Sequence, residues 1–197
     1  MFNQLTDNVC NMRNDEIIGL AKNRFLPAEV MMAIAKFHYR RAHMYLCENK
    51  GLDKKTRDYL WSDACNRGYS NKSELLLHGH YRDEPEKYME LYNSHGNQMY
   101  SRSPWRANSC FIRGGWYNHT RSHTPSELLN RIYDERFAGK TSLETSAYTY
   151  YTTNIGYALR DMAQHVNCDL PLAIKLSTCG KPEVEKLAFQ KIVELSK

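Results

Sequence analysis

The chain has 197 residues, of which 42% are hydrophobic and 25% are charged, and its formal net charge at pH 7 is +5. This composition is ordinary for a folded domain that buries a core without disulfides, and it excludes collagen-like and low-complexity proteins. The sequence has no apolar run long enough to span a membrane and no CxxC pair among its six cysteines, so we expect a cytoplasmic protein with reduced thiols and no membrane contact.

The first part of the chain, residues 1–94, contains a degenerate helical repeat. Three segments begin at Leu20, Leu46 and Leu77, and each continues with a polar break. Each also has an aliphatic residue fourteen positions after its start, namely Ile34, Leu60 and Leu91. The pattern predicts a short helix, a tight loop and a second helix in each copy, and stacking of the copies buries a common core.

The first copy contains the phrase LAKNRFLPAEV, and a shortened copy, LSTCGKPEVEKLA, begins at Leu176. The phrase resembles the recurrent LA-x-N-x-x-x-P-x-E-V-L motif of the leucine-rich repeat variant, with Met31 in place of the final leucine. More broadly, the copies resemble HEAT-like repeats. The resemblance implies an α-helical solenoid. An irregular bundle of amphipathic helices is the alternative, and both possibilities are all-α.

Residues 95–123 interrupt the repeats. The segment is rich in Gly, Ser and Asn, lacks helical periodicity, and is longer than an ordinary connection between helices. No Asp or Glu occurs between Glu90 and Glu127, so the segment is basic. Its aromatic residues argue against disorder. We therefore expect an ordered insert, either a loop or a small hairpin.

Arginine and aromatic side chains of this insert form the predicted binding surface. Arginine donates paired hydrogen bonds to phosphate, and tryptophan and tyrosine stack on unpaired bases. The same residue types anchor protein interfaces, and they also pack onto a helical body as purely structural residues. The predicted partner-binding residues are Arg102, Trp105, Arg106, Arg113, Trp116, Tyr117 and Arg121.

The third part, residues 124–197, is predicted to be helical and to pack on the same core. Thr124 is the expected N-cap of a helix with Pro125 at its first position, and Gly139 is the expected stop. A second helix is expected from Thr141 onwards. The last helix is expected from Pro182, with one apolar face made by Val184, Ala188, Ile192 and Leu195.

Catalytic and metal-binding motifs are weak in this sequence. His119 and His123 are four residues apart but lie just before the expected N-cap, so we predict no metal site and no cofactor. Cys110 lies near two arginines, and a buried thiol is the favoured interpretation. No phosphate-binding loop, dinucleotide-binding glycine motif or nucleophile elbow is present.

The sequence therefore predicts an all-α protein, solenoid-like or an irregular helical bundle, with one long basic aromatic insert. The first hypothesis is a non-enzymatic binding module that docks nucleic acid or an acidic protein surface through the insert, and these two partners are nearly tied. The alternative is a structural subunit of a viral particle or a viral inhibitor of a host protein. A nucleic-acid-processing enzyme is the third hypothesis, and the oligomeric state stays open.

Overall fold

The structure is a computed structural model that describes residues 8–37, 39–62, 68–102, 111, 123–139 and 155–197. Of residues 68–70 and 95–102 it describes the backbone alone. Within these ranges every regular element is a helix, so the all-α prediction is confirmed. The chain forms two compact units, residues 1–80 and residues 81–197.

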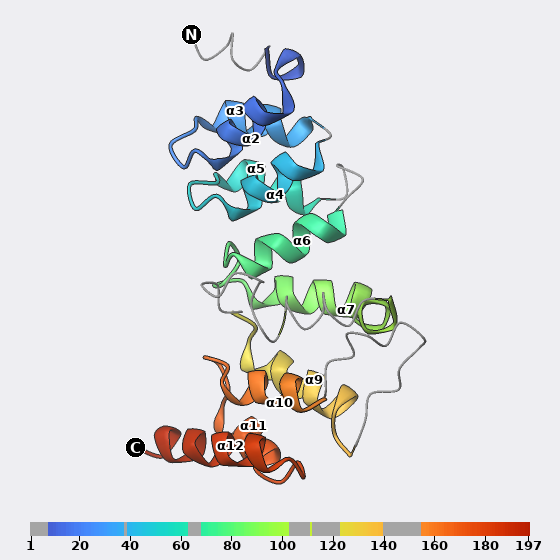
Figure 1. Cartoon of the computed structure of the whole chain (residues 1–197), viewed down its shortest axis with the longest axis vertical. Helices are drawn as coiled ribbons and strands as arrows, with labels where there is room; N and C mark the ends of the chain where they lie inside the picture. Colours follow the sequence, from blue (N-terminus) through green and yellow to red (C-terminus); the bar gives the residue numbers. More distant parts are fainter. Residues whose placement is uncertain (1–7, 38, 63–67, 103–110, 112–122, 140–154) are drawn as a thin grey trace. The chain divides into compact units, whose positions relative to one another are not determined.

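The N-terminal unit is a stack of short helices (Figure 1). Its elements are η1 (Val9–Asn11), α2 (Asn14–Lys22), α3 (Ala28–Lys36), α4 (Arg40–Glu48), α5 (Lys54–Trp61) and α6 (Gly68–Leu77). Helices α2 and α3 form one pair, and α4 and α5 form the next. Helix α4 packs on both members of the first pair, and α6 packs on both members of the second. Each pair therefore covers the apolar face of the pair before it.

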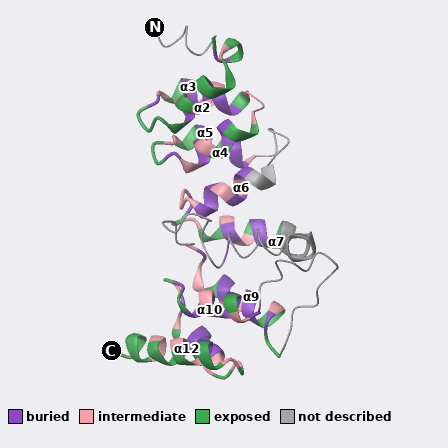
Figure 2. Ribbon diagram, viewed as in Figure 1, coloured by how far each residue is buried: buried purple, intermediate pink, exposed green. Residues whose placement is uncertain are grey.

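The repeat predicted from the sequence has the expected core residues. Ile34 on α3 and Leu60 on α5 are fully buried, and Leu91 is fully buried in the C-terminal unit. Buried positions in α3 recur at spacings of three and four residues, which places them on one face of the helix. Figure 2 shows buried residues gathered on the inner sides of the stacked helices and exposed residues on their outer sides.

The C-terminal unit also consists of helices among its described residues. They are α7 (Pro85–Arg102), α9 (Ser126–Arg136), α10 (Ile155–Ala163), α11 (Leu170–Leu176) and α12 (Pro182–Leu195). Helix α12 packs on both α10 and α11, and α9 packs on α11. The relation of α12 to its two neighbours is therefore the same as that of α4 to α2 and α3 in the N-terminal unit.

Several helix boundaries differ from those expected. Helix α7 continues to Arg102, so the first eight residues of the predicted insert are helical. Helix α9 begins at Ser126 with Pro125 as its N-cap, one residue later than expected, and Thr124 is fully buried just before it. The helix expected from Thr141 lies partly outside the described residues, and its described part is α10.

The last helix begins at Pro182, as predicted, and its apolar face is shorter than predicted. Val184 and Ala188 are buried and Ile192 is half-buried, but Leu195 is exposed. Leu195 is the final residue of α12, and no described helix covers it there. Gly139 has a φ of 69°, the left-handed conformation that suits a helix stop.

Candidate functional site

Three hydrogen bonds shape the loop between α4 and α5. The side-chain oxygen of Asn49 accepts the N–H of Gly51 (2.9 Å), and the carbonyl of Asn49 accepts the N–H of Leu52 (3.0 Å). The carboxylate of Asp53 then accepts the N–H of Thr56 (3.0 Å) and so caps α5. The loop is therefore closed at both ends by its own side chains, which gives it a fixed shape.

Asn49 also ties this loop to the preceding pair of helices. Its side-chain nitrogen donates hydrogen bonds to the carbonyls of Ala21 (2.9 Å) and Asn23 (3.0 Å), at the C-terminal end of α2. Asn49 is buried, so these carbonyls have a partner where water is excluded. Asn23 is at the equivalent position of the first copy, and its side chain accepts the N–H of Phe25 in the same kind of turn (3.0 Å).

Gly51 allows the two loops to touch. A Cβ atom at this position would overlap the carbonyl oxygen of Arg24 and would lie 2.9 Å from its carbonyl carbon. Because the overlapped atoms belong to the backbone, rotation of a side chain cannot relieve the contact. The loops of the first two helix pairs are therefore in direct contact, one above the other on the same side of the unit (Figure 1).

The two interlocked loops expose cations and an aromatic ring. We call this surface the loop edge and define it by Lys22, Arg24, Phe25, Tyr45 and Lys50. The Phe25 side chain is 78% exposed, and the guanidinium carbon of Arg24 lies 4.8 Å from the centre of its ring. The ammonium of Lys22 lies 4.2 Å from the centre of the Tyr45 ring. These are cation–π contacts at the surface, which hold the cations beside apolar rings.

Cations occupy equivalent places in the first two copies. Arg24 and Lys50 each follow the loop asparagine, and both are exposed. The acidic residues closest along the chain to Lys50 are Glu48, which is half-buried, and Asp53, whose carboxylate already caps α5. The one closest to Arg24 is Glu29, which is exposed in the first turn of α3. The loop edge can therefore present two cations in fixed register to an anionic group, with a ring beside one of them.

A second contact between successive helix pairs lies at the end of α6, where a histidine takes the place of the asparagine. The imidazole Nε2 of His80 donates to the carbonyl of Cys47 at 2.7 Å, as Asn49 donates to Ala21 one copy earlier. Burial lowers the pKa of His80 below its ordinary value, so the neutral donor form is favoured. The guanidinium of Arg57 in turn donates to the carbonyl of His80 (2.6 Å).

A loop of the C-terminal unit has the same geometry. His165 takes the place of Asn49: its Nδ1 accepts the N–H of Asn167, and its carbonyl accepts the N–H of Cys168, both at 3.0 Å. Asp169 then caps α11 by accepting the N–H of Leu172 (2.9 Å). The copy in this unit thus begins before α11, whereas the sequence comparison placed a shortened copy after it.

His165 and Cys168 are buried in neutral form. Burial and, to a lesser extent, the nearby charges of His123 and Lys191 lower the pKa of His165 to about 4. Burial raises the pKa of the Cys168 thiol to about 11. The Nε2 atom of His165 has no hydrogen-bond partner among the described residues. These groups are stabilised as an uncharged imidazole and an uncharged thiol, which suits a structural role in the loop.

The described part of the insert contains one anchor. Phe111 is fully buried, and its ring meets that of Tyr92 edge-on, with ring centres 5.8 Å apart. The Tyr92 hydroxyl donates to Glu135 (2.7 Å), and Arg131 donates to the other oxygen of that carboxylate (2.7 Å). These two bonds lower the pKa of Glu135. One aromatic residue of the insert thus packs on α7 as a core residue.

The predicted partner-binding residues are otherwise beyond what the structure describes. Trp105, Arg106, Arg113, Trp116, Tyr117 and Arg121 lie outside the described residues, as do Cys110 and His119. Arg102 is the last residue of α7, and its side chain is not described. The loop edge, by contrast, was missed by the sequence analysis. The repeat alignment already placed Asn23 and Asn49 at the same position, and this was the available signal.

A half-open pocket of about 480 Å³ lies between η1, α3 and the start of α5. Its wall includes Asp53 and Thr56, whose Oδ2 and Oγ1 atoms are buried without a hydrogen-bond partner among the described residues. Within the described ranges, no group of three or more His, Cys, Asp or Glu converges on a metal position. None of the helices described there is both long and apolar enough to cross a membrane.

Comparisons with known proteins give no match. No protein-family model matches the sequence, and no curated protein and no solved structure is significantly similar to it. The function is therefore argued from the loop edge and from the residue types of the insert.

Proposed function

We propose that this chain is a non-enzymatic binding module for single-stranded nucleic acid, with the loop edge of the N-terminal unit and the 95–123 insert each acting as a contact surface of its own. The observation that carries the proposal is the interlocked pair of loops, in which Asn49 and Gly51 hold Arg24 and Lys50 in fixed register. Because the backbone positions of the two cations are already fixed, binding of phosphate groups orders only their side chains, which lowers its entropic cost. The arginine-rich insert supplies further cations of the type that phosphate favours.

The exposed ring of Phe25 favours a nucleic acid with unpaired bases over an acidic protein surface. A phenylalanine that is 78% exposed beside an arginine offers a flat face on which a base stacks while the arginine binds the adjoining phosphate. Such stacking is worth about 1–3 kcal/mol per base. An acidic protein surface would pair with the cations of the loop edge, whereas a strand with unpaired bases uses the cations and the face of the ring together.

The experiment is a fluorescence anisotropy titration of labelled single-stranded RNA and DNA with four proteins at one low salt concentration. The first is the unaltered chain, and the second carries Arg24→Glu with Lys50→Glu. The third carries Arg106→Ala with Arg113→Ala in the insert. The fourth carries Arg40→Glu with Arg41→Glu at the opposite end of α4. It changes the net charge by the same amount as the second protein and is its matched control.

We expect each of the two site variants to weaken binding by roughly tenfold or more, and the control to change it by less than about threefold. Phe25→Ala should weaken binding by a similar factor without lowering stability, because the ring is exposed. Absence of saturable binding to every oligonucleotide would refute the proposal. Equal losses in the control and in the site variants would show that net charge alone is responsible.

An acidic protein partner is the other outcome to test. If the unaltered chain binds a polyglutamate peptide and no oligonucleotide, the partner is an acidic protein and the role of Phe25 is wrong. If the Arg106→Ala, Arg113→Ala protein binds normally but unfolds at a markedly lower temperature, the insert is structural and the loop edge alone remains.

A further inference from the structure

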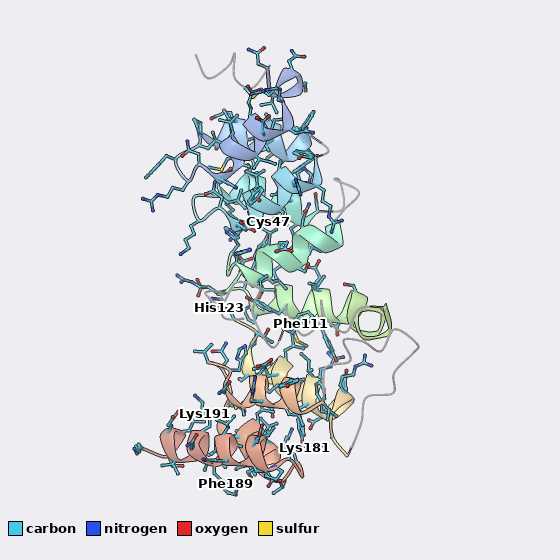
Figure 3. All side chains as sticks on the ribbon, viewed as in Figure 1. Cys47, Phe111, His123, Lys181, Phe189 and Lys191 are labelled. Atoms are coloured by element: carbon cyan, nitrogen blue, oxygen red, sulfur yellow. The ribbon has the colours of Figure 1, made fainter. Side chains whose placement is uncertain are left out.

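The outer face of α12 carries exposed apolar side chains. Phe189 is 57% exposed and Val193 is 58% exposed, and they are four residues apart on one side of the helix. In Figure 3 Phe189 lies on the side of α12 away from α10, and Lys191 lies on the side towards it. Ile174 and Leu170 on the neighbouring α11 are also exposed. Two adjacent helices thus leave apolar residues in water.

Comparison with the N-terminal unit shows what such a helix ordinarily has against it. Helix α4, which packs on the pair before it as α12 does, is itself covered by α6. Among the described residues, no helix covers the outer face of α12 in the same way. Stacked helical repeats need a polar outer face at the end of the stack. The outer face of α12 has apolar residues at its centre instead.

Charges on the outer face of α12 are arranged symmetrically around Gln190. Lys186 lies four residues before this glutamine, and Glu194 lies four residues after it. Glu183 in the first turn lies seven residues before it, and Lys197, two residues beyond the end of the helix, lies seven residues after it. All four charged side chains are exposed. Charged residues at equal distances before and after Gln190 have opposite signs, so this face is complementary to an antiparallel copy of itself.

We propose that the chain forms a homodimer in which α12 packs antiparallel on α12 of a second copy around a two-fold axis near Gln190. An interface between identical patches requires that each contact occur twice with its partners exchanged. Lys186 then lies opposite Glu194 of the partner subunit, and Glu194 lies opposite Lys186 of the partner subunit. Phe189 and Val193 of the two copies are buried between the helices. This inference does not depend on the proposed nucleic-acid binding.

Glu194 is available for this contact. Its closest intrachain partner is Lys191, with 3.7 Å between the charged atoms, and the carboxylate is 66% exposed. A surface pair of this kind contributes little to folding, so exchanging it for a contact with the partner subunit costs little. Lys186 has no ion pair with any described residue.

The test is sedimentation velocity of the full chain over a concentration series, with a charge-reversal scheme. Lys186→Glu alone places like charges opposite each other twice, and so does Glu194→Lys alone. Each should raise the dimer dissociation constant by roughly tenfold. The protein carrying both changes should dimerise as the unaltered chain does. An equimolar mixture of the two single variants should form a heterodimer, because every charge then meets its opposite.

Apolar variants provide a second measure. Phe189→Asp with Val193→Asp should give a monomer with unchanged circular dichroism, because both side chains are exposed in the folded unit. Phe25→Asp, which alters an exposed ring in the other unit, is the matched control and should leave the dimer intact. The proposal is overturned if the unaltered chain stays monomeric up to hundreds of micromolar. The proposal is also overturned if the unaltered chain dimerises but neither the protein with both charge reversals nor the mixture of the two single variants does.

Discussion

Replacement of Asn49 by alanine tests the contact between the first two helix pairs. The side chain donates to two carbonyls of the preceding pair and accepts one N–H within its own loop. Each buried hydrogen bond contributes about 1 kcal/mol, and the Ala21 carbonyl loses its donor while the Asn23 carbonyl keeps the N–H of Leu26, so the free energy of unfolding should fall by about 3 kcal/mol. For a unit of this size that corresponds to roughly 15 °C in melting temperature.

Asn23→Ala is the matched control for this prediction. Asn23 has the same position in the first copy, but it is exposed and its side chain makes the turn bond to Phe25 without a bond to another pair. Its replacement should cost about 0.5–1 kcal/mol. Thermal unfolding of the full chain followed by far-ultraviolet circular dichroism measures both variants. Equal decreases for Asn49→Ala and Asn23→Ala would refute the idea that the Asn49 side chain holds the pairs together.

Three further predictions concern the loops and their buried groups. Gly51→Ala should lower the free energy of unfolding by about 2 kcal/mol, because the new Cβ clashes with the backbone of Arg24. At Gly19 a Cβ meets no atom within 4 Å, so Gly19→Ala should raise the free energy of unfolding by about 0.5–1 kcal/mol. Urea denaturation measures both variants. The pKa of His165 is about 4 in the folded protein and 6.5 in the unfolded chain, so between these values the unfolded state binds one more proton. The free energy of unfolding should therefore fall by about 3 kcal/mol as the pH drops from 6.5 to 4. His165→Asn, which keeps the hydrogen-bond acceptor of the turn, should flatten that decline in a pH series of denaturant titrations. Cys10 is exposed and should react with iodoacetamide in the folded protein at pH 8, while burial and a pKa of about 11 should protect Cys168 until the chain unfolds. Mass spectrometry of peptides shows which cysteine is modified first, and equal rates for the two would contradict the burial of Cys168.

The fold class could be predicted because burial follows local sequence spacing. Ile34 and Leu60 recur at a fixed distance from the loop, and a helix of that length brings them to the core. Helix ends were harder to predict. Thr124 is the expected N-cap of α9, but the N-cap of the structure is Pro125, and the Thr124 carbonyl accepts a hydrogen bond from Asn167 (2.9 Å). That contact joins residues far apart in the sequence, and local capping rules contain no term for it.

The sequence analysis missed the loop edge and the similar loop at His165 in the C-terminal unit, for different reasons. Asn49 was visible in the alignment, but its bonds to Ala21 exist only when the pairs stack. The loop at His165 has the geometry of the Asn49 loop through another chemical group, since an imidazole nitrogen accepts the N–H that an amide oxygen accepts in the first unit. A search for similar letters cannot find an equivalence that lies in hydrogen-bond geometry.

The salt dependence of oligonucleotide binding tests the proposed function most directly. If the chain contacts about four phosphates in all, the logarithm of the association constant for a single strand should fall with the logarithm of salt concentration with a slope of about −3. Arg24→Glu with Lys50→Glu should make that slope shallower by about 1–2. A slope near zero, or a slope unchanged in this variant, would contradict the account.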